Sequence, residues 1–302
     1  MDTPSGHVPV MMAEVLESLK PAPGEVMLDG TAGGGGHAAA IRERLRPGGR
    51  LILLDRDRES LERLMARFGR EGDVRYFHAN FRDFDQALTE AGEDQIDGAL
   101  LDVGLSSLQL AEPERGFSFD QPGPLDMRFD RSQTLTAETI VNRWPEERLA
   151  ATFREYGDQP MAGRIARVIV EARRREPICR TDVLAQIVMR ALPAAFRRRE
   201  KIHPATRVFQ AIRIAVNDEL KSLDTFFDKI FDHLKPGGRV VVIAFHSGED
   251  RIVKTRMREA ASQGRVRLPF TKPMTPTPEE IEANPRSRSA RLRVAQVLPS
   301  AG

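Results

Sequence analysis

The feature that most constrains the fold is a short apolar stretch that ends in an acid and continues into four consecutive glycines. Residues 26–28 are apolar, Asp29 follows them, and the glycines are residues 33–36, before a run of good helix formers. Glycine adopts positive φ angles and lets a ligand approach the main chain, and the first N–H groups of a helix are free to bind that ligand. This order predicts a strand, a glycine turn and a helix that together bind a cofactor.

A second acid indicates what kind of cofactor is bound. Asp55 ends the next apolar stretch, 22 residues after Gly33, where an acid typically accepts hydrogen bonds from a ribose. Residues 33–38 also match the dinucleotide pattern, so an NAD-dependent oxidoreductase is an alternative. Asp29 argues against it, because a carboxylate at that place repels a pyrophosphate and suits a cationic or amino-bearing ligand. We therefore expect S-adenosylmethionine as the cofactor.

Composition places the chain among cytoplasmic globular proteins. Its 302 residues, 40% hydrophobic and 30% charged, suffice for one large domain or two ordinary ones. No stretch approaches the ~20 apolar residues of a membrane helix, and no signal peptide is evident. The single cysteine, Cys179, suits a reducing cytoplasm, and we expect it to be a packing residue. The six histidines are scattered, so we expect no metal site.

The net charge of +2 is divided unevenly along the chain. Residues 160–216 contain 13 Lys and Arg against 4 Asp and Glu, which is typical of a face that binds a polyanion. Arginine triplets lie at 173–175 and at 197–199. The alternative is a solvated helical surface. We expect Arg197, Arg198 and Arg199, with His203 and Arg207, to contact RNA.

The pattern of apolar residues predicts one α/β domain with an inserted helical domain. Strands are expected at 26–29, 50–55, 74–79, 97–102, 239–245 and 291–297, and helical periodicity dominates 137–220. Strands that alternate with helices form a parallel sheet with right-handed crossovers. We therefore expect residues 1–115 and 217–302 to form the cofactor-binding domain. Residues 116–216 are expected to form an inserted, basic, all-helical domain that faces RNA.

Polar residues at the ends of the later strands are candidates for the chemistry. Asp102 ends the fourth strand, where it can receive part of the cofactor or a substrate amine, and Ser106 follows on the next turn. His246 follows the fifth strand. It is either a general base, since imidazole titrates near neutrality, or a cap of the following helix. We name Asp102, Ser106 and His246 as the catalytic candidates.

Several long motifs resemble the RsmH (MraW) family, whose members methylate N4 of a cytidine in small-subunit ribosomal RNA with S-adenosylmethionine. The similarity runs almost from end to end. The motifs that carry it include His7-Val8-Pro9-Val10, Asp29-Gly30-Thr31, Leu54-Asp55-Arg56-Asp57, Arg115-Gly116-Phe117-Ser118-Phe119, His203-Pro204-Ala205-Thr206-Arg207 and Phe245-His246-Ser247.

The resemblance implies a class I Rossmann-like methyltransferase fold with an inserted helical domain. It implies the cofactor-binding residues Gly35, Gly36, His37, Asp55, Phe81, Asp102 and Gln109. It also implies 16S ribosomal RNA within the small subunit, at the decoding region, as the substrate. The oligomeric state stays open.

The chain departs from the family pattern at a few positions. Gly248 stands where leucine is usual, Ala244 where serine is usual, and residues 158–160 are Asp-Gln-Pro where two acids and an arginine are usual. Two further alternatives are an RNA-binding assembly factor without enzymatic activity and a methyltransferase of small molecules. The second leaves the basic helical segment unexplained.

Overall fold

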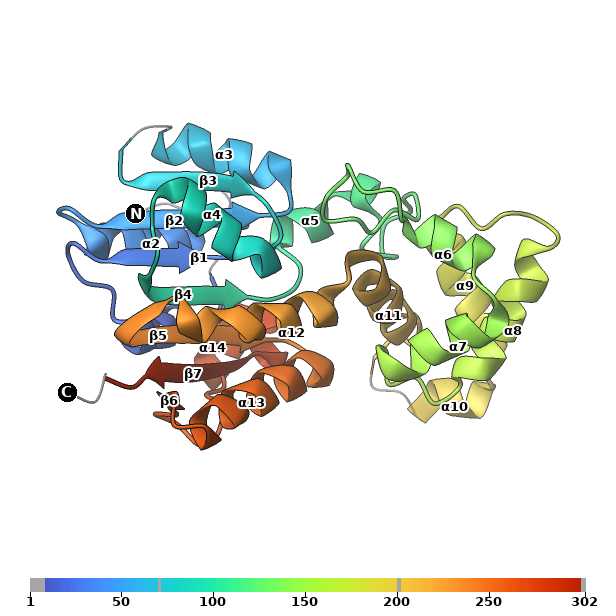
Figure 1. The fold of residues 1–302 in the computed structure, drawn as a ribbon. Helices are drawn as coiled ribbons and strands as arrows, with labels where there is room; N and C mark the ends of the chain where they lie inside the picture. Colours follow the sequence, from blue (N-terminus) through green and yellow to red (C-terminus); the bar gives the residue numbers. More distant parts are fainter. Residues whose placement is uncertain (1–8, 70–71, 200–201, 300–302) are drawn as a thin grey trace. The chain divides into compact units, whose positions relative to one another are not determined.

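The computed structural model describes residues 9–69, 72–199 and 202–299, which belong to two compact units (Figure 1). The first unit combines residues 1–104 with 220–302, and the second comprises residues 105–219. The chain therefore leaves the first unit after Gly104 and returns to it at Leu220, whereas the sequence suggested residues 116 and 216 as the limits of the inserted domain. The loop that follows the fourth strand accordingly belongs to the second unit.

A seven-stranded sheet with the order β3-β2-β1-β4-β5-β7-β6 forms the centre of the first unit. β1 to β5 are parallel and β7 runs antiparallel to β5 and β6. The strands are β1 (Val26–Asp29), β2 (Arg50–Asp55), β3 (Val74–His78), β4 (Ile96–Asp102), β5 (Leu234–Ala244), β6 (Val266–Arg267) and β7 (Arg291–Val297). The strand order reverses between β1 and β4, and ligands bind beyond the carboxyl ends at such a switch point. The predicted Rossmann-like α/β fold is confirmed.

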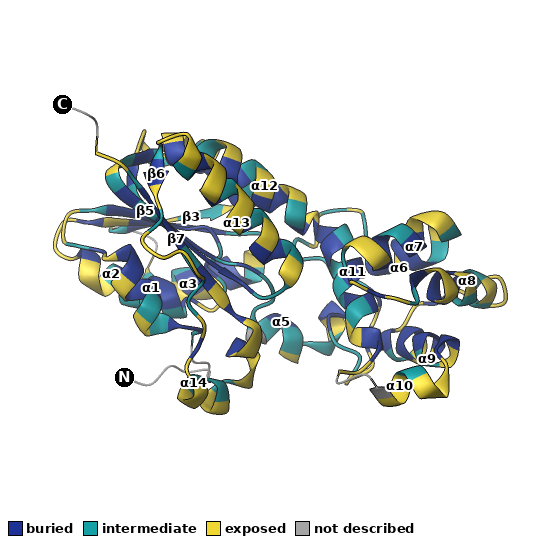
Figure 2. Cartoon of the chain, turned by 90° about the horizontal axis from the view of Figure 1, so that it is seen from below, coloured by how far each residue is buried: buried dark blue, intermediate teal, exposed yellow. Residues whose placement is uncertain are grey.

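Both faces of this sheet are covered by helices, so the strands are mostly buried (Figure 2). Leu51 and Leu53 of β2 belong to one apolar cluster, with residues of α1, α2 and α3. Ile52 and Leu54 belong to the other cluster, with residues of α4, α12 and α13. Side chains alternate along a strand, so a wholly apolar strand serves both layers. These helices are α1 (Met12–Leu19), α2 (Gly36–Leu45), α3 (Arg58–Phe68), α4 (Phe84–Ala91), α12 (Glu219–Lys229) and α13 (Ser247–Ser262). A short helix, α14 (Pro278–Ala283), precedes β7.

The second unit is helical and has an apolar core of its own. Its helices are α5 (Ser107–Ala111), α6 (Ala137–Arg143), α7 (Glu146–Glu155), α8 (Ala162–Arg173), α9 (Thr181–Ala191), α10 (Ala194–Arg199) and α11 (Ala205–Asn217). Ile165 and Ile169 of α8 are fully buried, and Val168 and Ala172 pack partly buried against the same core. This is the helical periodicity that the sequence shows.

The structure differs from the sequence interpretation in several local features. β5 begins at Leu234, five residues earlier than expected, because Leu234 already pairs with Ile96 and the register then shifts across the turn at residues 236–238. Cys179 is exposed, so the expectation of a packing residue is wrong, and the neighbouring Ile178 is the buried one. Within the described ranges, no helix combines the length and the apolar character that a membrane crossing requires.

Candidate active site

The glycine turn between β1 and α2 is closely covered by neighbouring side chains. Gly35 has a φ of 74°, and a Cβ there would lie 2.1 Å from Cδ2 of Leu64. A Cβ on Gly36 would lie 2.2 Å from Cγ of Pro9. A side chain at either position would therefore displace a packed neighbour, and at Gly35 it would also be held in the left-handed region. The close packing thus requires glycine at the start of α2.

Asp55 holds this turn from the end of β2. Its Oδ2 accepts a hydrogen bond from the Gly33 N–H at 2.7 Å, and its Oδ1 accepts one from the Asp57 N–H at 2.8 Å. Both oxygens of the carboxylate thus accept from main-chain groups at the edge of the predicted cofactor site. Asp55 therefore both fixes the turn and suits the role that its spacing predicted.

Thr31 joins the acids at the two central strand ends. Its Oγ1 accepts a hydrogen bond from the Asp102 N–H at 2.7 Å. Its own N–H donates to Oδ1 of Asp29 at 3.0 Å, and its hydroxyl lies 3.4 Å from the same oxygen. Asp29 and Asp102 are thereby tied together at the switch point between β1 and β4.

Both of these acids have raised pKa values. Burial raises the pKa of Asp29 to about 7, against the opposing hydrogen bond from Thr31. Burial raises the pKa of Asp102 to about 8, and the nearby charges of Asp29 and Glu249 raise it further. Removal of a carboxyl from water disfavours its charged form. Two acids that titrate near neutrality at one switch point are typical of a functional site.

One oxygen of Asp102 is left for a ligand. Its Oδ1 is buried, and no hydrogen-bond partner for it is present among the residues that the structure describes. A buried acceptor without a partner costs about 1–3 kcal/mol. A bound amine or cation would remove this cost, so the residues present fit a cofactor or substrate that carries such a group.

His37 lies beside the other oxygen of Asp102. Its imidazole is buried, with Nε2 at 3.0 Å from the Val10 carbonyl oxygen and Nδ1 at 3.7 Å from Oδ2 of Asp102. Phe81, another predicted cofactor residue, is 9% exposed and packs edge-on against Phe226 at a centroid distance of 6.1 Å. His37 therefore adds a polar group beside Asp102 at the switch point. Little of the Phe81 ring is exposed for contact with a ligand.

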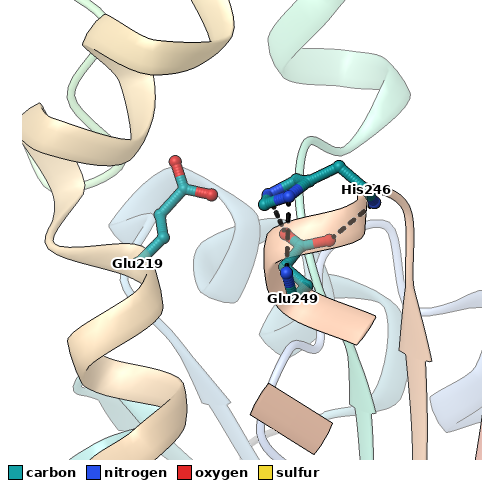
Figure 3. Close-up of side chains that lie close together, drawn as sticks. All are labelled: Glu219, His246 and Glu249. Atoms are coloured by element: carbon teal, nitrogen blue, oxygen red, sulfur yellow. Dashed lines mark hydrogen bonds and ion pairs between the residues drawn. The ribbon is translucent and has the colours of Figure 1, made fainter. Parts of the chain in front are cut away.

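His246 caps α13, the second of the two roles that the sequence left open (Figure 3). Its Nδ1 accepts hydrogen bonds from the N–H groups of Gly248 and Glu249 at 3.2 and 3.4 Å. Its Nε2 lies 3.1 Å from Oε1 of Glu249. Oε2 of Glu249 in turn accepts from the N–H groups of Phe245 and His246. Nδ1 is thus bound in the cap, whereas Nε2, although close to Glu249, has no hydrogen-bond partner among the residues that the structure describes.

Ser106 and Gln109 form a second capping box in the helical unit, at the start of α5. Oγ of Ser106 accepts a hydrogen bond from the Gln109 N–H at 3.2 Å, and Oε1 of Gln109 accepts one from the Ser106 N–H at 3.1 Å. Gln109 is buried. Ser106, predicted for catalysis, and Gln109, predicted for cofactor binding, are therefore joined by reciprocal hydrogen bonds.

The predicted RNA-binding arginines lie on α10. Arg197 and Arg198 are exposed, whereas the side chain of Arg199 lies outside the described structure. In the same unit, Nη1 of Arg207 donates to the carbonyl oxygen of Asp158 at 3.4 Å. The two described α10 side chains are thus free of burial and suit a solvated or polyanion-binding surface.

An aromatic depression lies in the helical unit beside His203. The ring of His203 stacks on Phe119 with a centroid distance of 4.6 Å and a tilt of 35°. The two rings line a hollow of about 350 Å³ together with residues of α9, among them Gln186 and Arg190. Phe119 lines this hollow and was not among the residues that the sequence interpretation named. The signal was its place in the motif Arg115-Gly116-Phe117-Ser118-Phe119.

Comparison with known proteins identifies the family of this chain. The model of the MraW methylase family matches residues 4–298. The chain belongs to the MraW methylase family. Two curated relatives carry the name Ribosomal RNA small subunit methyltransferase H. One, from Nitratidesulfovibrio vulgaris strain Miyazaki F, is 49% identical over 97% of this chain and 86% of its own length. The other, from Pelobacter propionicus, is 50% identical over 97% of this chain and 98% of its own length.

Within this MraW methylase, the first unit gathers five of the predicted cofactor residues at the carboxyl edge of its sheet. Gly35, Gly36 and His37 begin α2, and Asp55 and Asp102 end β2 and β4. The link that the sequence interpretation missed is Thr31. Its hydroxyl accepts a hydrogen bond from the Asp102 N–H and so joins β1 to β4.

The unusual stretch of residues 158–160 forms an ordered turn before α8. Asp158 has a φ of 45°, and Gln159 is buried, with Oε1 accepting a hydrogen bond from the Met161 N–H at 3.2 Å. Asp and Asn tolerate the left-handed region better than other side chains. Asp158 and Gln159, two residues of this departure from the family pattern, therefore shape the local main chain.

Proposed function

We propose that this protein transfers a methyl group from S-adenosylmethionine to the exocyclic N4 of a cytidine in 16S ribosomal RNA, at the decoding region of the small subunit. The methyl donor is S-adenosylmethionine, and the reaction takes place in the cytoplasm. Membership of a methylase family supports the reaction, and the names of the two relatives support the ribosomal RNA substrate. The observation that carries the chemistry is the buried, unpartnered Oδ1 of Asp102 at the switch point, among the residues that the structure describes.

Asp102 is the proposed catalytic residue. The N4 amine of cytidine is a poor nucleophile, since its lone pair is delocalised into the ring. S-adenosylmethionine, when bound, supplies an electrophilic methyl group. Oδ1 of Asp102 accepts a hydrogen bond from the amine, which orients the remaining lone pair. The same oxygen takes the proton that the amine releases when the new bond to carbon forms.

The acids around Asp102 are suited to a cationic ligand. A positive charge nearby favours the ionised form of a carboxyl and lowers its pKa. Asp102, with a pKa of about 8 without a ligand, therefore becomes a hydrogen-bond acceptor when the cationic cofactor binds. Ser106 and His246, the other two catalytic candidates, act in this proposal through the helix caps they form.

RNA binding is assigned to the helical unit. Its exposed arginines Arg197 and Arg198, with Arg199 and Arg207, supply positive charge for the phosphates. The stacked rings of His203 and Phe119 offer a platform for an unpaired base, and single-stranded RNA is bound largely by such stacking. A base that is to react must leave its stack, and a stacking platform on the protein lowers the cost of that exposure.

The test is methyl transfer from labelled S-adenosylmethionine to small ribosomal subunits that lack the modification, followed by digestion of the RNA to nucleosides. Label in N4-methylcytidine is the expected result, and naked 16S RNA serves as a parallel substrate. Label in another nucleoside would contradict the assigned substrate. Tight binding of cofactor and subunits without any label would instead favour the assembly factor.

A further inference from the structure

The N-terminal segment of residues 9–11 contacts the start of α2 at two points and α14 at a third. Pro9 lies against Gly36, where even a Cβ would be 2.2 Å from its ring. The Val10 carbonyl oxygen lies 3.0 Å from Nε2 of His37. The Met11 N–H donates to Oε1 of Glu280, in α14, at 2.6 Å. We call residues 9–11 the N-terminal strap.

The strap fixes the orientation of the His37 ring. Because Val10 offers a carbonyl oxygen, which only accepts, Nε2 of His37 carries a proton in this contact. Nδ1 then points at Oδ2 of Asp102, 3.7 Å away. A neutral imidazole with its proton on Nε2 presents Nδ1 as an acceptor, and an imidazolium presents it as a donor.

We propose that His37 is a positioning residue that shares a proton with Oδ2 of Asp102 and so leaves Oδ1 as the oxygen that meets the ligand. The geometry divides the carboxyl in this way, since Oδ2 faces the imidazole and Oδ1 is buried without a partner among the described residues. The strap acts through His37, because it holds the ring from the side opposite Asp102. The role of the ligand rests on the proposed function, but the proton shared in the empty protein does not.

The surroundings explain why such a partner is needed. The charged groups that face Asp102 from the neighbouring elements are Asp29 of β1 and Glu249 of α13, and Asp55 of β2 lies near Asp29. Asp29 and Glu249 are acids, and their negative charges favour the protonated form of Asp102. In the part of the chain that the structure describes, His37 is the one basic side chain within 4 Å of that carboxyl. It can share this proton with the carboxyl, so that the imidazole engages Oδ2 and Oδ1 is left for the ligand.

The direct test is the NMR titration of the histidine side chains in the full-length protein without cofactor. In Asp102→Asn, which keeps the shape but removes the charge, the pKa of His37 should fall by at least one unit. His233, whose Nδ1 lies near the Asp94 carbonyl oxygen in the loop before β4, should titrate unchanged and serves as the internal control. An unchanged His37 titration in Asp102→Asn would overturn the proposal.

A second variant covers the case in which that substitution disturbs the fold. Glutamine at position 37 can still donate to Val10 but cannot carry a proton for Asp102. We expect His37→Gln to move the pH midpoint of S-adenosylmethionine binding, measured by calorimetry from pH 6 to 9, upward by at least half a unit. His233→Gln should leave the midpoint where it is.

A proton-sharing role and a merely structural role of His37 predict different pH dependences of cofactor binding in His37→Gln. A merely structural role would weaken cofactor binding by the same factor at every pH, and that outcome would overturn the proposal. Neither experiment contains RNA, so a failure here is distinct from a failure of the proposed methyl transfer. If the strap acts through His37, Glu280→Ala should shift the midpoint in the same direction by a smaller amount.

Discussion

The two units hold their charged candidate residues in opposite ways. In the first unit, Asp29 and His37 are buried, and Asp55 is held by main-chain donors. In the helical unit, Arg197 and Arg198 are exposed. A buried carboxyl is costly unless it is hydrogen-bonded or paired, whereas exposed cations attract phosphates through an interaction that depends on salt.

The two units therefore differ in how their charged residues can act on a ligand. In the first unit, the carboxyl groups of Asp29 and Asp102 have raised pKa values when no ligand is bound. In the helical unit, the basic side chains Arg197 and Arg198 are exposed. Their electrostatic attraction acts over a distance that the salt concentration sets. Variants in the first unit should therefore change the chemistry steeply, and variants in the second should change affinity gradually.

Removal of the Asp102 charge should have the largest effect. We expect Asp102→Asn to lower turnover more than tenfold, because an amide in place of the carboxylate cannot take the amine proton. Steady-state methyl transfer to small subunits measures this. Near-normal turnover would contradict the assignment of Asp102 and would remove the contrast between the two units.

The same substitution should stabilise the empty protein at high pH. A carboxyl whose folded pKa is raised binds more protons folded than unfolded, so its contribution to stability falls as the pH rises from about 4 toward its folded pKa. Asparagine is free of this loss. We expect the Tm of Asp102→Asn, relative to the unaltered chain, to be higher at pH 8 than at pH 4, where the acid is neutral when folded. Calorimetry without cofactor measures this, and an equal difference at both pH values would contradict the raised pKa.

Substitution of Gly35 should weaken cofactor binding by about tenfold. Alanine there costs roughly 1–2 kcal/mol for its left-handed conformation, and its Cβ would meet Leu64. Calorimetric titration with S-adenosylmethionine measures the affinity. Gly34→Ala is the matched control, since a Cβ on Gly34 meets nothing within 4 Å. Equal effects at both positions would show that the close packing of the turn is unimportant.

The sequence predicted the frame of the first unit because its signals are local. Apolar strands that end in acids at Asp29, Asp55 and Asp102 indicated where a ligand would lie, and the sheet places all three at one edge. The glycine turn also followed, because four glycines between a strand and a helix suit few other structures.

Contacts between distant segments were beyond the reach of sequence reasoning. The bond from Met11 to Glu280 spans 269 residues, and nothing in either neighbourhood signals it. The capping roles of His246 and Ser106 were also ambiguous, since the residues that cap a helix are the same types that perform catalysis. The orphaned oxygen of Asp102 is a property of packing, and no spacing in the sequence reveals it.

The arginines of α10 should have a moderate effect that depends on salt. Replacement of Arg197, Arg198 and Arg199 by glutamine should weaken RNA binding several-fold. It should also flatten the salt dependence of binding by about 0.7–0.9 in log–log slope for each phosphate that the variant no longer neutralises. Replacement of three exposed arginines of the first unit, Arg44, Arg63 and Arg258, is the control with the same change in net charge. Equal slopes for the two variants would reduce the α10 arginines to a solvated surface.

Gly248, where the family usually has leucine, should have the smallest effect. A Cβ there would lie 3.2 Å from the His246 ring and 3.5 Å from Leu220, so Gly248→Leu presses on the imidazole without replacing it. Leucine also favours the helix by up to about 1 kcal/mol over glycine. We expect turnover within twofold of the unaltered chain and a slightly higher Tm, because a histidine that only caps α13 tolerates a small shift. A loss of turnover above tenfold with an unchanged Tm would assign chemistry to His246, and the first unit would then have a second reacting group at its strand ends.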